Sequence, residues 1–177
     1  MYCVFCEKKS RNSEKDVEEL YCIHCRRCGS YRIDIKSYRD FKVSSLYKSR
    51  HFIISIIKEI NCSGRIPTIG FANELPDDGI LTFEKMISMY PKSIEEKIER
   101  ITTNLKRRSE EKKIITLMKN DYAFYYSEDE EEMKKIKSIL LERDLIDIKR
   151  HEMGILSKKS YRYNFFEDIC IKITDKC

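Results

Sequence analysis

The sequence predicts an α+β protein, made of a small cysteine-rich ribbon, a mainly helical middle and a winged helix-turn-helix-like C-terminal domain. Three observations predict this class. Two Cys-x-x-Cys pairs lie at the N-terminal end, apolar residues recur at helical spacing through the middle, and their period becomes alternating after Asp144. We expect the ribbon over residues 1–40, a helical linker region over 41–92 and the winged-helix-like domain over 93–177.

The ribbon is predicted from its cysteines. Cys3 and Cys6 form one pair and Cys25 and Cys28 the other, with an insert of 18 residues between them. A C-x-x-C turn presents two thiolates from one tight loop, so two turns complete the tetrahedral, four-thiolate set of a structural Zn²⁺ site. Gly29 suits the backbone that turns its amides toward the sulfurs. The pattern predicts a zinc ribbon, with a redox dithiol or unligated thiols as the alternative.

Cys22 makes the ligand set ambiguous, because Cys22-Ile23-His24-Cys25 is also a C-x-x-C sequence. In a strand, Cys22 and His24 share one face, whereas Ile23 and Cys25 share the other. We therefore expect Cys25 to face inward as the ligand and Cys22 and His24 to be bystanders.

A short strand is expected after the second cysteine pair. Tyr31, Ile33 and Ile35 alternate with polar residues. A ribbon of this size buries too little apolar surface to fold alone, so the metal is expected to supply the missing stability. Four thiolates leave no open coordination position, which predicts a structural role and no catalytic one.

Helices are expected in the middle of the chain from apolar periodicity and capping residues. The predicted segments are 46–60, ended by Asn61-Cys62-Ser63-Gly64; 82–89, opened by Thr82; 94–105, capped by Ser93 and Glu96; a separate segment around 114–118 after the charged joint 106–111; and 127–143, capped by Ser127 and Glu130.

Two alternating segments close the chain. Leu145, Ile146 and Ile148 are followed by a turn at 151–154 and later by Ile169, Ile171 and Ile173. The order of helices, strand, turn and strand is typical of a winged helix-turn-helix.

Three stretches carry a resemblance to a known group of proteins. They are 25–33 (CRRCGSYRI), 91–98 (PKSIEEKI) and 171–176 (IKITDK). Together they resemble a loose group of uncharacterised bacterial proteins with an N-terminal zinc ribbon, a helical middle and a C-terminal winged-helix-like module, often fused to an effector domain such as a TIR-like one. The resemblance implies a regulatory or defence-associated role and assigns no catalytic residue.

Cysteine usage and hydropathy predict the compartment. The chain has eight cysteines but opens without a basic-then-apolar leader, and no apolar run is long enough to cross a bilayer. We expect a cytoplasmic protein with reduced thiols and no membrane contact.

Charge suggests a partner. Residues 1–50 hold twelve Lys or Arg against seven Asp or Glu. We hypothesise that the basic ribbon face binds nucleic acid or another anion through phosphate contacts and base stacking. The candidate residues are Arg26, Arg27, Arg32, Arg39 and Tyr31. The alternative is that these charges only keep the ribbon soluble. The helix expected from residue 127 begins with several carboxylates. These would repel DNA phosphates, so we do not expect this helix to recognise DNA.

Other function classes remain as hypotheses. One is a protein-interaction or oligomerisation module, such as a homodimer formed through the apolar stripe of the first long helix. Another is a small-molecule sensor lined by the aromatic residues around 122–126 and 161–166. We do not expect an enzyme, because His24, His51 and His151 have no nucleophile or carboxylate near them in a catalytic pattern.

Overall fold

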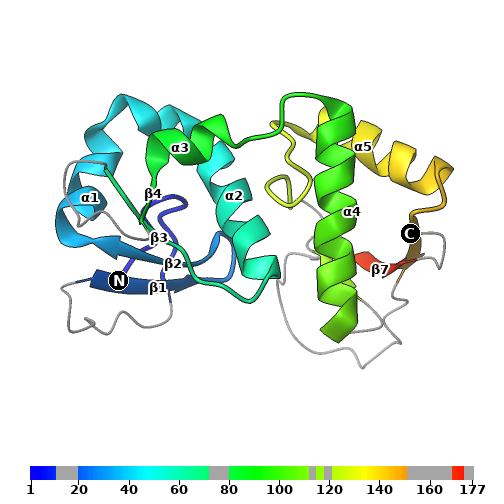
Figure 1. Ribbon diagram of the computed structural model, residues 1–177, viewed down its shortest axis with the longest axis horizontal. Coiled ribbons are helices and arrows are strands. Elements are labelled where there is room, and N and C mark those ends of the chain that lie inside the picture. Colours follow the sequence, from blue (N-terminus) through cyan, green and yellow to red (C-terminus); the bar gives the residue numbers. More distant parts are fainter. Residues whose placement is uncertain (11–19, 72–79, 112–114, 118–120, 151–168, 174–177) are drawn as a thin grey trace, which may run out of the picture.

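The computed structural model describes residues 1–10, 20–71, 80–111, 115–117, 121–150 and 169–173, and side chains within 1–10, 20–71, 80–108 and 121–146. It is a mixed α+β structure with two halves (Figure 1). The N-terminal half is a four-stranded sheet with helices α1, α2 and α3. The C-terminal half contains helices α4 and α5 and a three-stranded sheet. The predicted α+β class is confirmed.

The first sheet has the strand order β1-β2-β3-β4. Strands β1 (Leu20–Cys25) and β2 (Gly29–Asp34) form an antiparallel hairpin, with Ile23 opposite Tyr31. Strand β3 (Thr68–Gly70) pairs parallel with β2, and β4 (Ile80–Thr82) pairs parallel with β3. The segment 41–92, expected to be a helical linker, therefore contributes two strands to the sheet of the ribbon.

Three helices belong to this half. Asp34 caps α1 (Ile35–Asp40) by accepting from the Ser37 amide at 2.7 Å. Two 3₁₀ turns, Phe41–Val43 and Ser45–Ser49, lead into α2 (Arg50–Cys62). The predicted helix over 46–60 thus starts later and ends close to the expected stop. Thr82 caps α3 (Phe83–Ser88), as predicted, by accepting from the Lys85 amide.

The apolar face of α2 covers one face of this sheet. Ile53, Ile56 and Ile57 are fully buried and belong to the same core as Ile23 and Ile33 of the strands. Burial of several such side chains, each worth about 1.5–3 kcal/mol, makes this contact a main source of stability. The stripe considered for self-association is therefore occupied within the chain.

Helix α4 (Ile94–Glu111) opens with the predicted capping box. The Glu96 amide donates to Ser93 Oγ at 3.1 Å, and Glu96 Oε2 accepts from the Ser93 and Lys92 amides. The predicted joint at 106–111 was wrong, because α4 continues through it. The charged residues there form the last turns of the helix, and the apolar residues that follow form strand β5 (Ile115–Leu117), not a further helix.

Helix α5 (Glu130–Glu142) starts with a different cap from the one predicted. Asp129 accepts from the Glu132 amide at 2.8 Å, and Glu132 Oε2 accepts from the Glu128 amide. Ser127 instead donates to the Tyr122 carbonyl. The capping box therefore uses the kind of hydrogen bonds that were predicted, but it begins at Asp129 instead of Ser127.

Strands β6 (Ile146–Arg150) and β7 (Ile169–Ile173) pair antiparallel, and β5 pairs with the other edge of β7. The resulting order is β5-β7-β6. The predicted strands are found, whereas the turn expected at 151–154 lies outside the described residues. Within the described part of the chain, no helix has both the length and the apolar character needed to cross a membrane.

A buried polar network joins the two halves. Glu59 of α2 accepts from Arg100 of α4 at 3.0 Å and from the Tyr126 hydroxyl at 2.8 Å. Asn104 of α4 donates to the same hydroxyl at 3.0 Å. Lys58 pairs with Asp121 beside it. Helix α2 is thus held by the first sheet on one side and by α4 and residues 121–126 on the other.

Candidate metal centre

The first cysteine pair lies on a tight backbone turn. The Cys3 amide donates to the Lys8 carbonyl, and the Glu7 amide donates to the Cys3 carbonyl, both at 2.9 Å. Tyr2 and Lys9 bridge the flanking chain. Glu7 has a φ of 58°, in the left-handed region that L-residues seldom adopt. The turn therefore places Cys3 and Cys6 on the same side.

The second pair ends β1 and precedes β2. Cys25 pairs with Gly29 across the hairpin, so Arg26, Arg27 and Cys28 form its connection. Gly29 has a φ of 94°. In each turn the residue after the second cysteine is left-handed, and glycine adopts that conformation without the penalty that Glu7 bears.

The two turns bring four sulfurs together. The Sγ atoms of Cys3, Cys6, Cys25 and Cys28 all lie within 4.8 Å of one another. Cys6 Sγ and Cys25 Sγ are 3.5 Å apart, far beyond the bonded distance of a disulfide, and all four thiols are free. Tetrahedral thiolate ligands at about 2.3 Å from a metal lie about 3.8 Å from each other. The arrangement is compatible with a four-thiolate metal site.

The thiols strongly affect one another's protonation. Contact with Cys28 lowers the pKa of Cys6 to about 7 and also lowers that of Cys25. Contact with Cys25 raises the pKa of Cys3 to about 12 and also raises that of Cys28, and burial adds to both. Thiolates so close repel one another, and a divalent cation would remove that repulsion and favour deprotonation of the whole set.

Tyr31 supports this centre from the hairpin. Its side chain is fully buried, and its hydroxyl lies 3.2 Å from Cys3 Sγ and accepts from the Val4 amide at 3.2 Å. Burial raises the pKa of Tyr31, so the hydroxyl keeps its proton and would donate to Cys3 once that sulfur is a metal-bound thiolate. Such a hydrogen bond orients a ligand and tunes its basicity.

The choice of Cys25 over Cys22 is supported by the geometry. Cys22 lies on the opposite face of β1, with its Sγ 3.4 Å from His24 Nε2, and His24 Nδ1 lies 2.9 Å from Ser30 Oγ. Cys25 is buried, and its sulfur lies with those of Cys3, Cys6 and Cys28. Strand alternation, on which the prediction rested, is what separates the two cysteines.

The predicted anion-binding residues do not form one surface. Arg26 and Arg27 are exposed at the hairpin tip, Arg39 is exposed on α1, and Arg32 is half-buried in β2. Tyr31 has no exposed ring face, so it cannot stack on a base. Only the two tip arginines are neighbours.

Asn61 is a site residue that sequence reasoning missed. From the end of α2 it hydrogen-bonds to the backbone of Ser30 and to the Arg65 carbonyl. In the sequence it reads as a helix stop, and no local signal shows that its amide reaches the hairpin 31 residues earlier.

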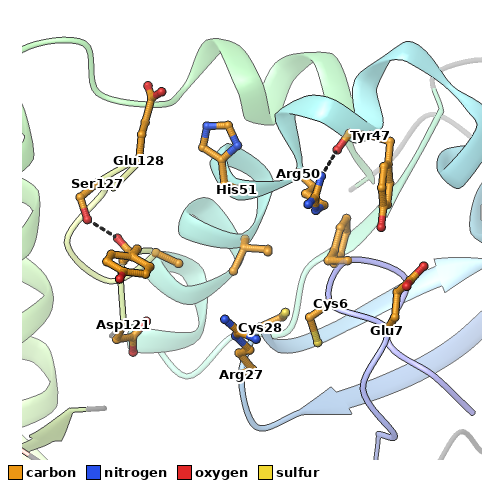
Figure 2. A pocket seen from close by; sticks show the side chains of 14 residues that line it. Cys6, Glu7, Arg27, Cys28, Tyr47, Arg50, His51, Asp121, Ser127 and Glu128 are labelled. Atoms are coloured by element: carbon orange, nitrogen blue, oxygen red, sulfur yellow. Dashed lines mark hydrogen bonds between the residues drawn. The ribbon is translucent and has the colours of Figure 1, made fainter. Parts of the chain in front are cut away.

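A cavity of about 340 Å³ adjoins the metal centre (Figure 2). It lies between the two cysteine turns, the start of α2 and residues 121–128, so both halves contribute to its walls. Cys6 and Cys28 are part of its lining.

Comparison with known proteins gives no relative: no family model, curated protein or solved structure matches this chain.

Proposed function

We propose that this protein is a non-catalytic recognition module in which a structural zinc ion fixes a basic hairpin for binding nucleic acid. The observation that carries the proposal is the position of Arg26 and Arg27. Both are exposed, and both lie between Cys25 and Cys28 in the turn that closes the metal centre.

Zinc is the metal that best suits the ligand set. Four thiolates in a tetrahedral arrangement select Zn²⁺ or an iron centre, and structural zinc sites of this kind are closed to further ligands. Three of the four cysteines are buried, so the ion would be shielded and held by the fold. Its contribution would be folding energy and rigidity, with no role in chemistry.

A metal-held turn suits phosphate recognition for an entropic reason. Ordering flexible side chains and loops on binding costs free energy, and a turn clamped at both ends has already lost that freedom. Arginine binds phosphate oxygens through two parallel hydrogen bonds. Two guanidinium groups carried by this fixed turn would therefore contact the backbone of a nucleic acid without reading its sequence.

The C-terminal half is proposed to have a role other than DNA recognition. Its sheet order β5-β7-β6, with β5 between α4 and α5, supports a winged-helix-like arrangement in this half. The first turn of α5 holds Glu130, Glu131 and Glu132. A recognition helix meets DNA with this turn, and three carboxylates would repel phosphates. We propose that this half packs against α2 or contacts a protein partner.

The test is a salt-dependent binding titration with the zinc-loaded protein. Fluorescence anisotropy with labelled single-stranded and duplex oligonucleotides should show affinity that falls with salt. The double variant Arg26→Ala/Arg27→Ala should bind more weakly and lower the slope of log K against log salt by about 1.8 on duplex DNA, since each phosphate contact contributes about 0.9.

Arg143→Ala is the matched control, because Arg143 is an exposed arginine at the end of α5. It should bind like the parent. A parent without affinity at low salt, or a double variant that binds as the parent does, would overturn the nucleic-acid proposal.

A further inference from the structure

The cavity beside the metal centre has walls from both halves of the chain (Figure 2). One end is formed by Arg27 and Cys28 of the hairpin turn. The opposite end is formed by His51 and Glu128, and Arg50 of α2 reaches in from the side. Small-molecule sites occur preferentially where two structural units meet.

The carboxylates around the cavity are largely neutralised. Asp121 pairs with Lys58, and Glu7 pairs with Lys42 at 3.0 Å. The Glu128 carboxylate points away from Arg27 and Cys28 in Figure 2. Negative charge in the lining is therefore either paired or directed elsewhere.

Neither arginine forms an ion pair within the described residues, although the charge of Arg50, after that of Lys42, helps to lower the pKa of Glu7. Arg50 is oriented by its own surroundings, since its guanidinium donates to the Tyr47 carbonyl at 3.2 Å and stacks on the Tyr47 ring at 4.6 Å. Arg27 makes no side-chain hydrogen bond to any described residue. A guanidinium that is held in place but has no carboxylate partner is a donor group ready for an oxyanion.

His51 lines the other end of the cavity, and one of its ring nitrogens is closed off from that space. His51 Nε2 is inaccessible to solvent and has no hydrogen-bond partner. Buried polar atoms usually have a partner, and an unpaired one costs about 1–3 kcal/mol. Desolvation lowers the pKa of His51, so its ring is neutral at pH 7 and acts as an ordinary hydrogen-bonding group.

The volume and the aromatic lining of the cavity suit a compact ligand. The volume of about 340 Å³ is at the lower end of the range for ligand pockets, which begins near 300 Å³. Phe5, Tyr47 and Tyr122 contribute aromatic surface. Two guanidinium groups and aromatic walls match a compact organic anion.

We infer that this cavity binds a small molecule that carries a phosphate or carboxylate group, with the oxyanion held by Arg27 and Arg50 and the rest of the ligand against the aromatic walls. This site shares Arg27 with the nucleic-acid surface proposed above, whereas Arg26 belongs only to that surface and Arg50 only to the cavity. Because its walls come from both halves, a ligand would fix residues 121–128 against the cysteine turns and stabilise the whole chain.

Isothermal titration calorimetry of the zinc-loaded protein with three probes tests the inference. Inorganic phosphate tests the oxyanion alone, adenosine 5′-monophosphate adds an aromatic ring, and citrate replaces phosphate with carboxylates. At least one probe should bind with a Kd below about 10 mM and raise the melting temperature. The order of affinities identifies the preferred anionic group.

Two variants of the cavity locate the binding. Arg50→Gln removes a guanidinium, and Ala123→Leu fills space in the lining without changing charge. Each should weaken the probe at least about tenfold, equivalent to about 1.4 kcal/mol. Circular dichroism and metal content show whether each variant folds. If the helical signal or the metal content falls for Arg50→Gln, the result for Ala123→Leu decides the test.

Arg26→Gln is the matched control, because Arg26 is next to Arg27 in the hairpin turn but is not among the residues that line the cavity. It should leave probe binding unchanged while weakening nucleic-acid binding, and Arg50→Gln should do the reverse. Because each variant should weaken only one kind of binding, the cavity proposal and the nucleic-acid proposal can fail independently. If no probe binds, or if both cavity variants bind as the parent does, the inference is wrong.

Discussion

The side-chain amide of Asn61 forms two hydrogen bonds with the backbone of Ser30, accepting from its amide at 2.7 Å and donating to its carbonyl at 3.0 Å. This is the pairing that a neighbouring strand would supply, made here by one residue at the end of α2. It anchors the strand that leaves the second cysteine turn. The position of that turn thus depends on helix α2, in addition to the cysteine cluster.

The first prediction concerns Gly29, which lies between Cys28 and this anchored residue. A Cβ at position 29 would lie 2.4 Å from Asn61 Oδ1 and 3.1 Å from Ile57 Cγ2, and the φ of 94° adds strain. Gly29→Ala should lower the free energy of unfolding by more than about 2 kcal/mol, measured by chemical denaturation. Gly64→Ala is the control, since Gly64 has a φ of 74° and no atom within 4 Å. It should cost only the backbone strain of about 1 kcal/mol, and equal losses would contradict the steric argument.

The second prediction separates the two candidate cysteines. Cys25→Ser should lose bound metal and unfold at a lower temperature, because Cys25 is one of the four clustered sulfurs. Cys22→Ser should retain one metal ion per chain, because its sulfur lies on the other face with His24. Metal analysis after challenge with a chelator measures both, and a metal-free Cys22→Ser protein would show that the ligand set is wrong.

The third prediction concerns Tyr31. Tyr31→Phe removes the hydrogen bond to Cys3 and leaves the Val4 amide without this partner, while the ring stays in place. We expect metal affinity to fall about 10–100-fold, as for other hydrogen bonds to ligands, and stability to fall by about 1–3 kcal/mol. Competition with a chromogenic chelator gives the affinity. Tyr38→Phe is the control, since the Tyr38 hydroxyl donates only to the exposed Tyr2 carbonyl.

A fourth prediction concerns the ion pair between α4 and α5. Lys97 is 5% exposed, and its Nζ lies 2.5 Å from Glu132 Oε1 and over the Tyr90 ring. Glu132→Gln leaves a buried ammonium without its counter-ion, whereas Lys97→Met leaves a carboxylate that is partly solvated. The first change should therefore destabilise by about 3–5 kcal/mol and the second by less. Urea denaturation of both variants tests this order, and the opposite order would contradict it.

The fifth prediction is a pH effect at His51. Burial is the main cause that lowers the pKa of this ring, and the nearby Glu128 only partly offsets it. The unfolded chain therefore takes up the proton near pH 6.5, whereas the folded protein does so only at lower pH. Stability should fall as the pH drops through 6.5, because the unfolded state then binds more protons. His51→Gln should lose less stability between pH 7.5 and 5.5 than the parent, and an NMR titration of the ring should give a pKa below 6.5.

Local patterns predicted the four clustered cysteines and most helices because each depends on residues close in sequence. The spacing of the cysteines, the Thr82 cap and the box of Ser93 and Glu96 are of this kind. The charged stretch 106–111 misled the prediction, since a solvated helix end and a linker have the same composition.

Long-range pairing could not be predicted in the same way. Strands β3 and β5 are three residues long, and their partners lie far away along the chain. The burial of Tyr31 against Cys3, and the reach of Asn61 to the hairpin, likewise depend on the folded chain. These contacts decide which of the predicted residues can face a ligand.

The position of α2 determines how this protein can be divided for study. A fragment that ends near residue 40 would keep the four clustered cysteines. It would lack the isoleucine face of α2, the Asn61 anchor and strand β3. The smallest piece that preserves the surroundings of the cysteine cluster therefore extends past Gly70. Removal of α4 would in turn expose the polar side of α2, where Glu59 binds Arg100. We expect the two halves to unfold together, as one cooperative unit centred on this helix.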